Sequence, residues 1–215
     1  MENLLIALLA SYLLGSLPTA LVMGKIIGGV DIREHGSGNA GATNVYRLFG
    51  FKPYIVTLAV DIFKGFAAVA FVAPYGAGFF TDGRVAIYCG VAVVAGHVWT
   101  IFAGFRGGKG VATAGGVFLG LAPWVALGAA IIYLAVTLTT KYVALGSMLA
   151  ALGAPAILFG QDAFRGQRSP AELYIIATAF AGLIVFTHRE NIKRLMKGEE
   201  TKTDFLVKFK RSKNK

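Results

Sequence analysis

Cysteine and charge are both scarce in this 215-residue sequence: it has one Cys, and only 15% of its residues are Asp, Glu, Lys or Arg. A soluble globular domain carries about a quarter charged residues. The lone thiol, Cys89, lies in an apolar run, which excludes a disulfide framework and a cysteine-based metal site. Hydrophobic residues make up 56% of the chain, and its mean hydropathy is +0.65. We therefore expect a membrane protein, whose net charge of +10 reports orientation and contact with anionic lipid headgroups rather than nucleic-acid binding.

Several catalytic signatures are missing as well. The sequence has no Gly-x-Ser-x-Gly elbow, no His-x-x-x-His pair and no carboxylate-rich metal set. It lacks the His-x-x-x-x-Asp acyltransferase pattern, because the fifth residue after each histidine is Ala40, Phe102 or Lys193. A nucleotide P-loop is excluded by spacing, since only three residues separate Gly104 from Gly108. We therefore expect neither a metal nor another cofactor.

Long uncharged runs predict an all-α, polytopic membrane protein. We expect spans at about 3–24, 53–72, 85–105, 143–160 and 173–187. The run 110–140 is far longer than the ~20 residues that one crossing needs, and Pro123 interrupts it. It therefore predicts two helices, at about 111–121 and 124–139. At ~1.5 Å per residue the first is too short to span comfortably, so we expect its neighbours to shield it. The total is seven transmembrane helices.

The distribution of positive charge favours seven spans over six. With seven spans and the N-terminus outside, the outer loops contain only three of the 21 Lys and Arg residues, namely Arg84, Arg165 and Arg168. Six spans would place the basic residues that follow His188 outside, against the positive-inside rule. We predict one transmembrane domain, residues 1–195, and a basic cytoplasmic tail, 196–215. Two interpretations of the tail stay open: it lies on anionic lipid of the inner leaflet, or it is a solvated end.

The strongest functional signal is a cationic break between two apolar runs. Residues 106–113 read Arg-Gly-Gly-Lys-Gly-Val-Ala-Thr. Glycines let backbone N–H groups turn towards an anion, Lys109 adds a mobile charge, and a helix starting at Val111 would present its positive end there. We predict an anion site built from Lys109 and its neighbours Gly107, Gly108 and Gly110. The alternative is an ordinary interhelical loop whose lysine marks the cytoplasmic side.

A second loop also has the composition of an anion site. Residues 36–44 are all small or polar, and Arg47 follows with a planar guanidinium suited to phosphate. Helix caps and turns use similar residues, but one cap does not require nine of them in a row. The candidate binding residues here are Ser37, Gly38, Asn39, Thr43, Asn44 and Arg47.

Two ionisable residues, Asp61 and Lys64, fall within the second predicted span and share a helix face. Such groups at membrane depth pair with one another or serve function, and both roles are open to Lys64. His97, in the third span, is interpreted first as a satisfied core histidine.

The last predicted span ends in a further cluster. His188, Asn191 and Arg194 follow one another at intervals of three, so a helix would present imidazole, amide and guanidinium on one face. The alternative is an ordinary basic juxtamembrane stretch, but the ordering leads us to predict a site.

These motifs together resemble one family, the bacterial acyl-phosphate-dependent glycerol-3-phosphate acyltransferases (the PlsY family). The resemblance is carried by Ser-Gly-Asn-Ala-Gly-Ala-Thr-Asn at 37–44 with Arg47, Asp61-x-x-Lys64-Gly65, Gly-Gly-Lys-Gly-Val-Ala-Thr at 107–113, and His188-x-x-Asn191. It extends to about Leu195 and does not include the basic tail. It implies a seven-helix enzyme of the bacterial inner membrane with its site on the cytoplasmic face. The implied reaction transfers an acyl group from acyl phosphate to the sn-1 hydroxyl of glycerol 3-phosphate, giving lysophosphatidic acid and phosphate.

Residue roles follow from that resemblance. We assign Lys109 and the three glycine amides to acyl phosphate, and the loop at 37–44 with Arg47 to glycerol phosphate, with Lys64 as a further contact. The hydroxyl proton passes to His188 or to a substrate phosphate oxygen, and Asn191 orients the reacting groups. Ser37 as an acyl-enzyme nucleophile is the less favoured alternative, because no base is visible beside it.

The residues suit this chemistry, because acyl phosphate is already activated and needs mainly positioning and charge stabilisation. The competing class is a transporter for an organic phosphate, which would also use intramembrane charges and phosphate-binding loops. Only the enzyme would release phosphate coupled to formation of lysophosphatidate.

Overall fold

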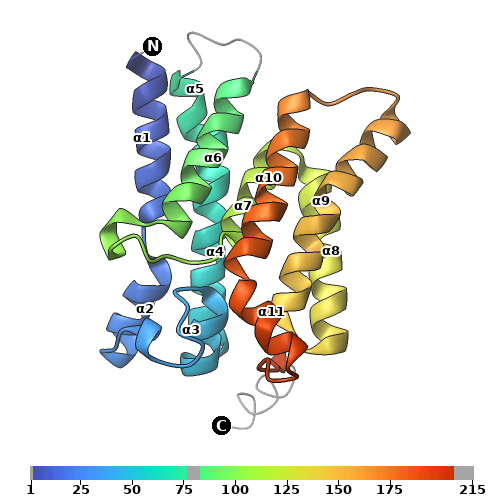
Figure 1. Ribbon diagram of the computed structural model, residues 1–215. Helices are drawn as coiled ribbons and strands as arrows, with labels where there is room; N and C mark the ends of the chain where they lie inside the picture. The colour runs from blue at the N-terminus through green and yellow to red at the C-terminus, as the bar shows by residue number, and fades with distance from the viewer. Residues whose placement is uncertain (1, 77–82, 206–215) are drawn as a thin grey trace.

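Helices make up all the regular structure in the computed structural model, which describes residues 2–76 and 83–205 (Figure 1). The first half of the chain contains α1 (Glu2–Ser16), α2 (Thr19–Gly28), α3 (Ala42–Phe49), α4 (Phe51–Ala67), α5 (Ala73–Gly76) and α6 (Arg84–Val98). The second half contains α7 (Val111–Leu121), α8 (Pro123–Thr140), α9 (Val143–Arg165), α10 (Ala171–Thr187) and α11 (Arg189–Met196). A short π-helical segment, Ala68–Val72, joins α4 to α5. The predicted all-α fold is confirmed.

Within the described ranges, five helical segments are long and apolar enough to cross a membrane. They are Glu2–Gly28, Phe51–Gly76, Arg84–Ala103, Pro123–Thr140 and Val143–Arg165. A sixth consists of α10 and α11 together, which are bent by 58° relative to each other. The apolar helix α7 has only 11 residues and is too short for that test. The number of crossings therefore depends on how α7 and the bent pair of α10 and α11 are counted.

Pro123 divides the long apolar run as predicted. Helix α7 ends at Leu121, and Pro123 occupies the first position of α8, where its missing N–H leaves no helical hydrogen bond unmade. Between them Ala122 is extended, with φ −150° and ψ 78°, because the residue before a proline avoids the helical region.

Pro18 breaks the first span, which we had predicted to be continuous over 3–24. Helix α1 stops at Ser16 and α2 begins at Thr19, because a proline in a helix interior removes one hydrogen bond and clashes with the preceding turn. The break leaves backbone carbonyls that need donors from elsewhere. Thr100 Oγ1 donates to the Ser16 carbonyl, and Lys64 Nζ donates to the Leu17 carbonyl at 3.1 Å.

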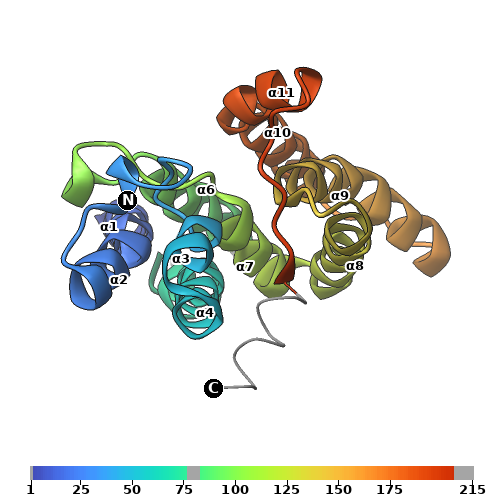
Figure 2. The same ribbon diagram turned by 90° about the horizontal axis from the view of Figure 1, so that it is seen from below.

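The helices form two groups with α7 between them. Helices α1, α4 and α6 lie on one side and α8, α9 and α10 on the other, as the view from below shows (Figure 2). The apolar core runs through this junction, where the rings of Phe118 in α7 and Phe180 in α10 meet edge to face at 5.9 Å. Helix α7 is therefore shielded by its neighbours, as its length predicted.

Glycines let helix backbones touch directly on the first side. A Cβ at Gly65 would collide with the backbone of Thr113, and one at Gly116 with that of Ile62, so α4 and α7 are in close contact. Gly96 and Tyr12 make the same kind of contact between α6 and α1. Small residues commonly bring membrane helices together in this way, because packing rather than water exclusion drives their association.

A Gly116→Ala substitution is expected to destabilise the protein by about 1–3 kcal/mol, since its methyl group has no space against the α4 backbone. Chaotrope titration in detergent would measure the free energy of unfolding. Gly182→Ala in α10 is the control, because nothing lies within 4 Å of its Cβ position. It should be neutral or stabilising by up to ~1 kcal/mol, and an equal loss in both variants would contradict the packing account.

Candidate active site

Four segments from distant parts of the sequence come together between the level of the break that separates α1 from α2 and the end of the molecule that carries α11. They are the loop 99–110 that precedes α7, the loop 29–41 that precedes α3, the junction of α10 with α11, and residues 199–205 (Figures 1 and 2). Three of the four contain residues that the sequence predicted to bind substrate. The fourth, 199–205, was not part of that prediction.

Lys109 is held by the junction of α10 and α11. Its ammonium donates a hydrogen bond to Asn191 Oδ1, and its backbone carbonyl accepts one from Thr187 Oγ1 at 3.1 Å. His188 is buried beside it, with Nδ1 at 2.8 Å from the carbonyl of Ile184. The structure therefore brings together Lys109, His188 and Asn191, which the sequence predicted to act together.

Burial governs the protonation of this cluster. It is the main cause that lowers the pKa of Lys109 to about 8, with repulsion from Arg194 and Arg47 acting in the same direction and the Glu200 carboxylate opposing. Burial and the neighbouring Lys109 charge lower the pKa of His188 to about 4. At pH 7 the site therefore contains a charged lysine beside a neutral imidazole.

Glu200 is a residue of the candidate site that the sequence analysis did not predict. Its side chain is almost fully buried, Oε1 accepts from Asn191 Nδ2 at 2.9 Å, and Oε2 accepts from Arg194 Nε at 2.8 Å. The carboxylate thus fixes the amide that contacts Lys109. No signal in the sequence indicates this role, because one Glu in a basic tail looks like a solvated residue.

Arg47 reaches the same cluster from α3. Its Nη2 donates to the Thr201 carbonyl and to Thr203 Oγ1, both at 3.2 Å. Residues 199–205 therefore pack on the site, although they lie within the stretch predicted as a separate tail. Residues 206–215 of that tail lie outside the described residues, and its lipid contact stays a prediction.

Asn44, which the sequence predicted to contact substrate, holds the loop before α3 in shape. It is 1% exposed, its Oδ1 accepts from the Ser37 N–H at 2.9 Å, and its Nδ2 donates to the carbonyls of Ile32 and His35. The amide is therefore engaged in shaping the loop before α3. Ser37, Asn39 and Thr43 remain partly exposed, and Gly38 adopts a left-handed conformation with φ 70°.

The glycine amides correct another expectation. The N–H groups of Gly107 and Gly108 donate to the carbonyls of Val98 and His97, at 3.0 and 3.1 Å, so they are engaged within the protein instead of facing a ligand. Glycine is needed here because a Cβ at Gly107 would strike the His97 backbone, and one at Gly108 would strike the His97 ring. Gly110 differs: its φ of 87° lets it cap the start of α7, whose first N–H groups have no partner within the helix.

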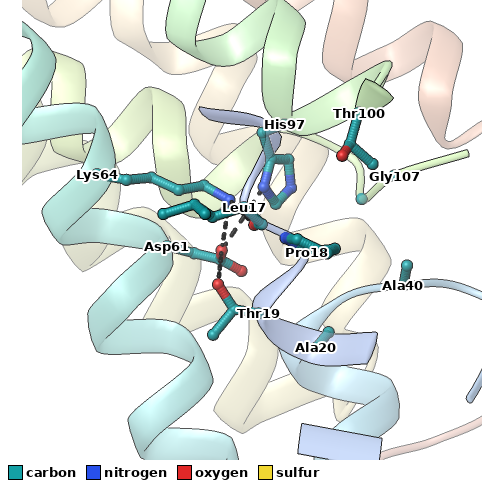
Figure 3. A pocket seen from close by; sticks show the side chains of 11 residues that line it. Leu17, Pro18, Thr19, Ala20, Ala40, Asp61, Lys64, His97, Thr100 and Gly107 are labelled. Carbon is teal, nitrogen blue, oxygen red and sulfur yellow. Dashed lines mark hydrogen bonds and ion pairs between the residues drawn. The ribbon is translucent and has the colours of Figure 1, made fainter. Parts of the chain in front are cut away.

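Beside this loop, a small pocket contains a buried ionic cluster (Figure 3). Lys64 Nζ lies 2.8 Å from Asp61 Oδ1, and both side chains are less than 5% exposed. Thr19 Oγ1 donates to the same oxygen at 3.3 Å, and His97 Nδ1 lies 3.6 Å from it. Asp61 and Lys64 therefore pair, which is one of the two roles that the sequence left open for them. His97 is buried, as a core histidine would be, and its side chain lines the pocket.

An Asp61→Ala substitution is expected to destabilise the protein by about 3–5 kcal/mol, because it leaves the Lys64 ammonium buried without its carboxylate. Thermal unfolding in detergent would detect the loss as a lower melting temperature. The double variant Asp61→Ala/Lys64→Met removes both charges and should recover most of the stability. A single variant as stable as the parent would show that the ion pair is unimportant for the fold.

Comparison with known proteins places these motifs in context. A family model described as glycerol-3-phosphate acyltransferase matches residues 5–198. The chain is 40% identical to the glycerol-3-phosphate acyltransferase of Pelodictyon phaeoclathratiforme, with 95% of this chain and 98% of that one covered. It is 44% identical to the enzyme of the same name from Geobacter sulfurreducens, with 94% and 98% covered.

The fold also matches solved structures. The crystal structure of PlsY (YgiH), an integral membrane glycerol 3-phosphate acyltransferase, in its glycerol 3-phosphate form gives a TM-score of 0.83 at 38% identity, covering 95% of this chain and 97% of that one. The lysophosphatidic acid form gives 0.82 at 37% identity, covering 94% and 96%. The family that the motifs predicted is therefore confirmed: the chain belongs to the glycerol-3-phosphate acyltransferases.

Proposed function

We propose that this protein transfers an acyl group from acyl phosphate to the sn-1 hydroxyl of glycerol 3-phosphate, giving lysophosphatidic acid and phosphate. The observation that carries the proposal is the meeting of Lys109, Arg47, His188 and Asn191 in one cluster, in a chain of this family. The related crystal structures are described as glycerol 3-phosphate and lysophosphatidic acid forms, which are substrate and product of this reaction.

The donor suits a site without a nucleophilic triad. In acyl phosphate the acyl carbon already bears a good leaving group, so the alcohol oxygen attacks it directly. The new ester C–O bond forms as the bond to the phosphate oxygen breaks, and its electron pair leaves with phosphate. The protein then has to align the reactants and stabilise the developing charge.

Lys109 is the residue best placed to stabilise that charge. Lys109 directly precedes Gly110, the cap residue of α7, and the N–H groups of a helix's first turn, which have no partner within the helix, also favour an anion. Asn191 fixes the ammonium and is itself fixed by Glu200. Since the Gly107 and Gly108 amides are engaged, we assign acyl phosphate to Lys109, Gly110 and this first turn.

Glycerol 3-phosphate is assigned to the loop before α3. The loop contributes Ser37, Gly38 and Asn39, and Asn44 maintains its shape. Thr43 and the charged Arg47 join them from the adjoining helix α3. The hydroxyl proton passes either to His188, which is neutral at pH 7, or to a phosphate oxygen of the substrate. Ser37 as an acylated nucleophile remains the less favoured route, to be tested by mass analysis of peptides after incubation with labelled acyl phosphate.

Lys64 receives a supporting role. Its ammonium is engaged by Asp61 and by the Leu17 carbonyl, so we assign it to holding the broken first span against α4. The pocket beside it is lined by Gly107 and Gly108, which connects this cluster to the loop of Lys109. Lys64 therefore contributes to the substrate site indirectly, by holding in place the helices that surround it.

We further propose seven membrane segments in the bacterial inner membrane, with α7 as the half-length fourth, the N-terminus outside and the active site on the cytoplasmic face. Two observations support this. First, α1 begins at one end of the molecule and α11 lies at the other (Figure 1). Second, the end of α2, the start of α4 and the end of α8, where Lys25, Lys52 and Lys141 occur in the sequence, lie towards the end that carries α11. The start of α6 and the connection from α9 to α10, where Arg84, Arg165 and Arg168 occur, lie at the opposite end. That distribution follows the positive-inside rule.

An organic-phosphate transporter is the alternative function. It is less well supported, because the residues assigned to phosphate gather in one cluster and the relatives are named as acyltransferases. Purified protein given glycerol 3-phosphate and acyl phosphate separates the two, since only an enzyme releases phosphate in step with lysophosphatidate.

In that assay, Lys109→Ala should lower kcat/KM by about 100-fold or more, the loss typical of removing a donor that stabilises transition-state charge. Lys52→Ala, which removes an exposed lysine from the same end of the molecule, is the control and should keep parental activity. Full activity of the Lys109→Ala protein would refute the central assignment.

The pH profile tests the same residue independently. Because the pKa of Lys109 is about 8, its ammonium is lost as pH rises through that value, so activity should fall above it. In Lys109→Arg the guanidinium stays charged, and whatever activity it retains should show no such fall below pH ~10. If the activity of the Lys109→Arg protein fell above about pH 8 just as that of the parent does, the loss would come from the titration of another group.

Membrane orientation can be tested by cysteine labelling, because the native Cys89 is buried and gives little background. A membrane-impermeant maleimide added to intact spheroplasts should label Arg168→Cys but leave Lys52→Cys unlabelled. Permeabilised cells should show labelling of both. The reverse pattern in intact spheroplasts would invert the proposed topology.

A further inference from the structure

The segment 199–205, which we call the strap, joins the two groups of helices across the end of the molecule that carries the site. It leaves α11 through a turn at Gly198, whose φ is 71°, and runs between the α3 end of one group and the α8–α9 turn of the other (Figure 2). Its polar anchor Thr203 is 4% exposed, so this part of the strap is buried. The strap is therefore packed against the rest of the protein.

On the first side the strap restrains Arg47. The Thr201 carbonyl and Thr203 Oγ1 both accept from the same guanidinium nitrogen, Nη2. The neighbouring Tyr46 donates from its hydroxyl to the Asp204 carbonyl at 3.0 Å, and its ring lies 4.6 Å from that of Phe205. These contacts fix where α3 presents the arginine.

On the second side the strap is anchored at Lys141. The Thr203 N–H donates to the Lys141 carbonyl at 2.8 Å, and the Lys141 ammonium lies 2.5 Å from Asp204 Oδ2. Lys141 itself adopts a left-handed conformation, with φ 63°, at the end of α8. Glycine is the usual residue at such a position, and a residue with a side chain pays about 1 kcal/mol to adopt this conformation. Lys141 therefore stands at a position where the backbone conformation favours glycine.

We propose that Thr203 is a positioning residue for glycerol 3-phosphate: it holds the Arg47 guanidinium in place, and the Lys141 anchor holds Thr203. The proposal rests on the proposed function, in which Arg47 binds the phosphate of that substrate. A free arginine side chain loses rotamer freedom when it binds an anion, and a restraint made in advance removes part of that cost. The strap therefore acts on the affinity for one substrate and leaves the chemical step alone.

The first experiment measures KM for each substrate with the purified full-length chain. Thr203→Val keeps the shape and removes the hydroxyl, and we expect it to raise KM for glycerol 3-phosphate by about 3- to 10-fold. The KM for acyl phosphate, kcat and the melting temperature should not change. Thr203→Ser, which restores the hydroxyl, should recover most of the affinity, and Glu199→Ala, an exposed change in the same segment, should behave as the parent.

The second experiment uses Lys141→Gly to separate positioning from stability. Glycine adopts the left-handed conformation without strain, so the melting temperature should stay the same or rise. Loss of the contact with Asp204 should still raise KM for glycerol 3-phosphate, though less than Thr203→Val does.

Two outcomes would overturn the proposal. One is an unchanged KM for glycerol 3-phosphate in Thr203→Val. The other is a parallel change in both KM values and the melting temperature, which would mean a general structural role. Failure of the proposed function is distinguishable from either, because the parent protein would then show no turnover at all.

Discussion

Inside a membrane protein a buried cation must find its oxygen within the chain, because little water is available to solvate it. Lys64 meets this requirement with the Asp61 carboxylate and with the Leu17 carbonyl exposed where Pro18 breaks the first span. Lys109 meets it with the amide oxygen of Asn191. The broken helix, the bend between α10 and α11 and the path of the strap all place oxygen atoms beside nitrogen cations, and the candidate site follows from that requirement.

The same requirement explains the position of Glu200. Arg194 and Arg47 repel the Lys109 ammonium and so lower the pKa of Lys109. The Glu200 carboxylate partly balances these positive charges. A phosphate group that binds at the cluster would bring close to two negative charges, and the donors around it are already oriented by that carboxylate. Charge balance inside the protein and recognition of an anion thus use the same residues.

The sequence predicted much of this arrangement, and its failures have physical causes. Pro123 was recognised as a break because the run 110–140 is too long for one crossing, whereas Pro18 lies in a run whose length suits a single span. Lys109 and His188 were expected to meet because the count of crossings put them on one face. The hydrogen bonding of the Gly107 and Gly108 amides to the protein itself was not foreseeable. A glycine needed for close approach of a ligand and one needed for close approach of another part of the chain look the same in a sequence. Glu200 and Thr203 were missed because nothing local shows that a basic chain end folds back.

Direct backbone contact between the Gly107–Gly108 segment and the end of α6 has one more consequence. Two backbone hydrogen bonds, from the N–H groups of Gly107 and Gly108 to the carbonyls of Val98 and His97, hold the two pieces of chain together. The end of α6 is in turn tied to α1, through Tyr12 donating to the Trp99 carbonyl and Ser16 donating to that of Gly96. The lysine loop is therefore joined, through the end of α6, to the first helix of the chain by a continuous series of hydrogen bonds.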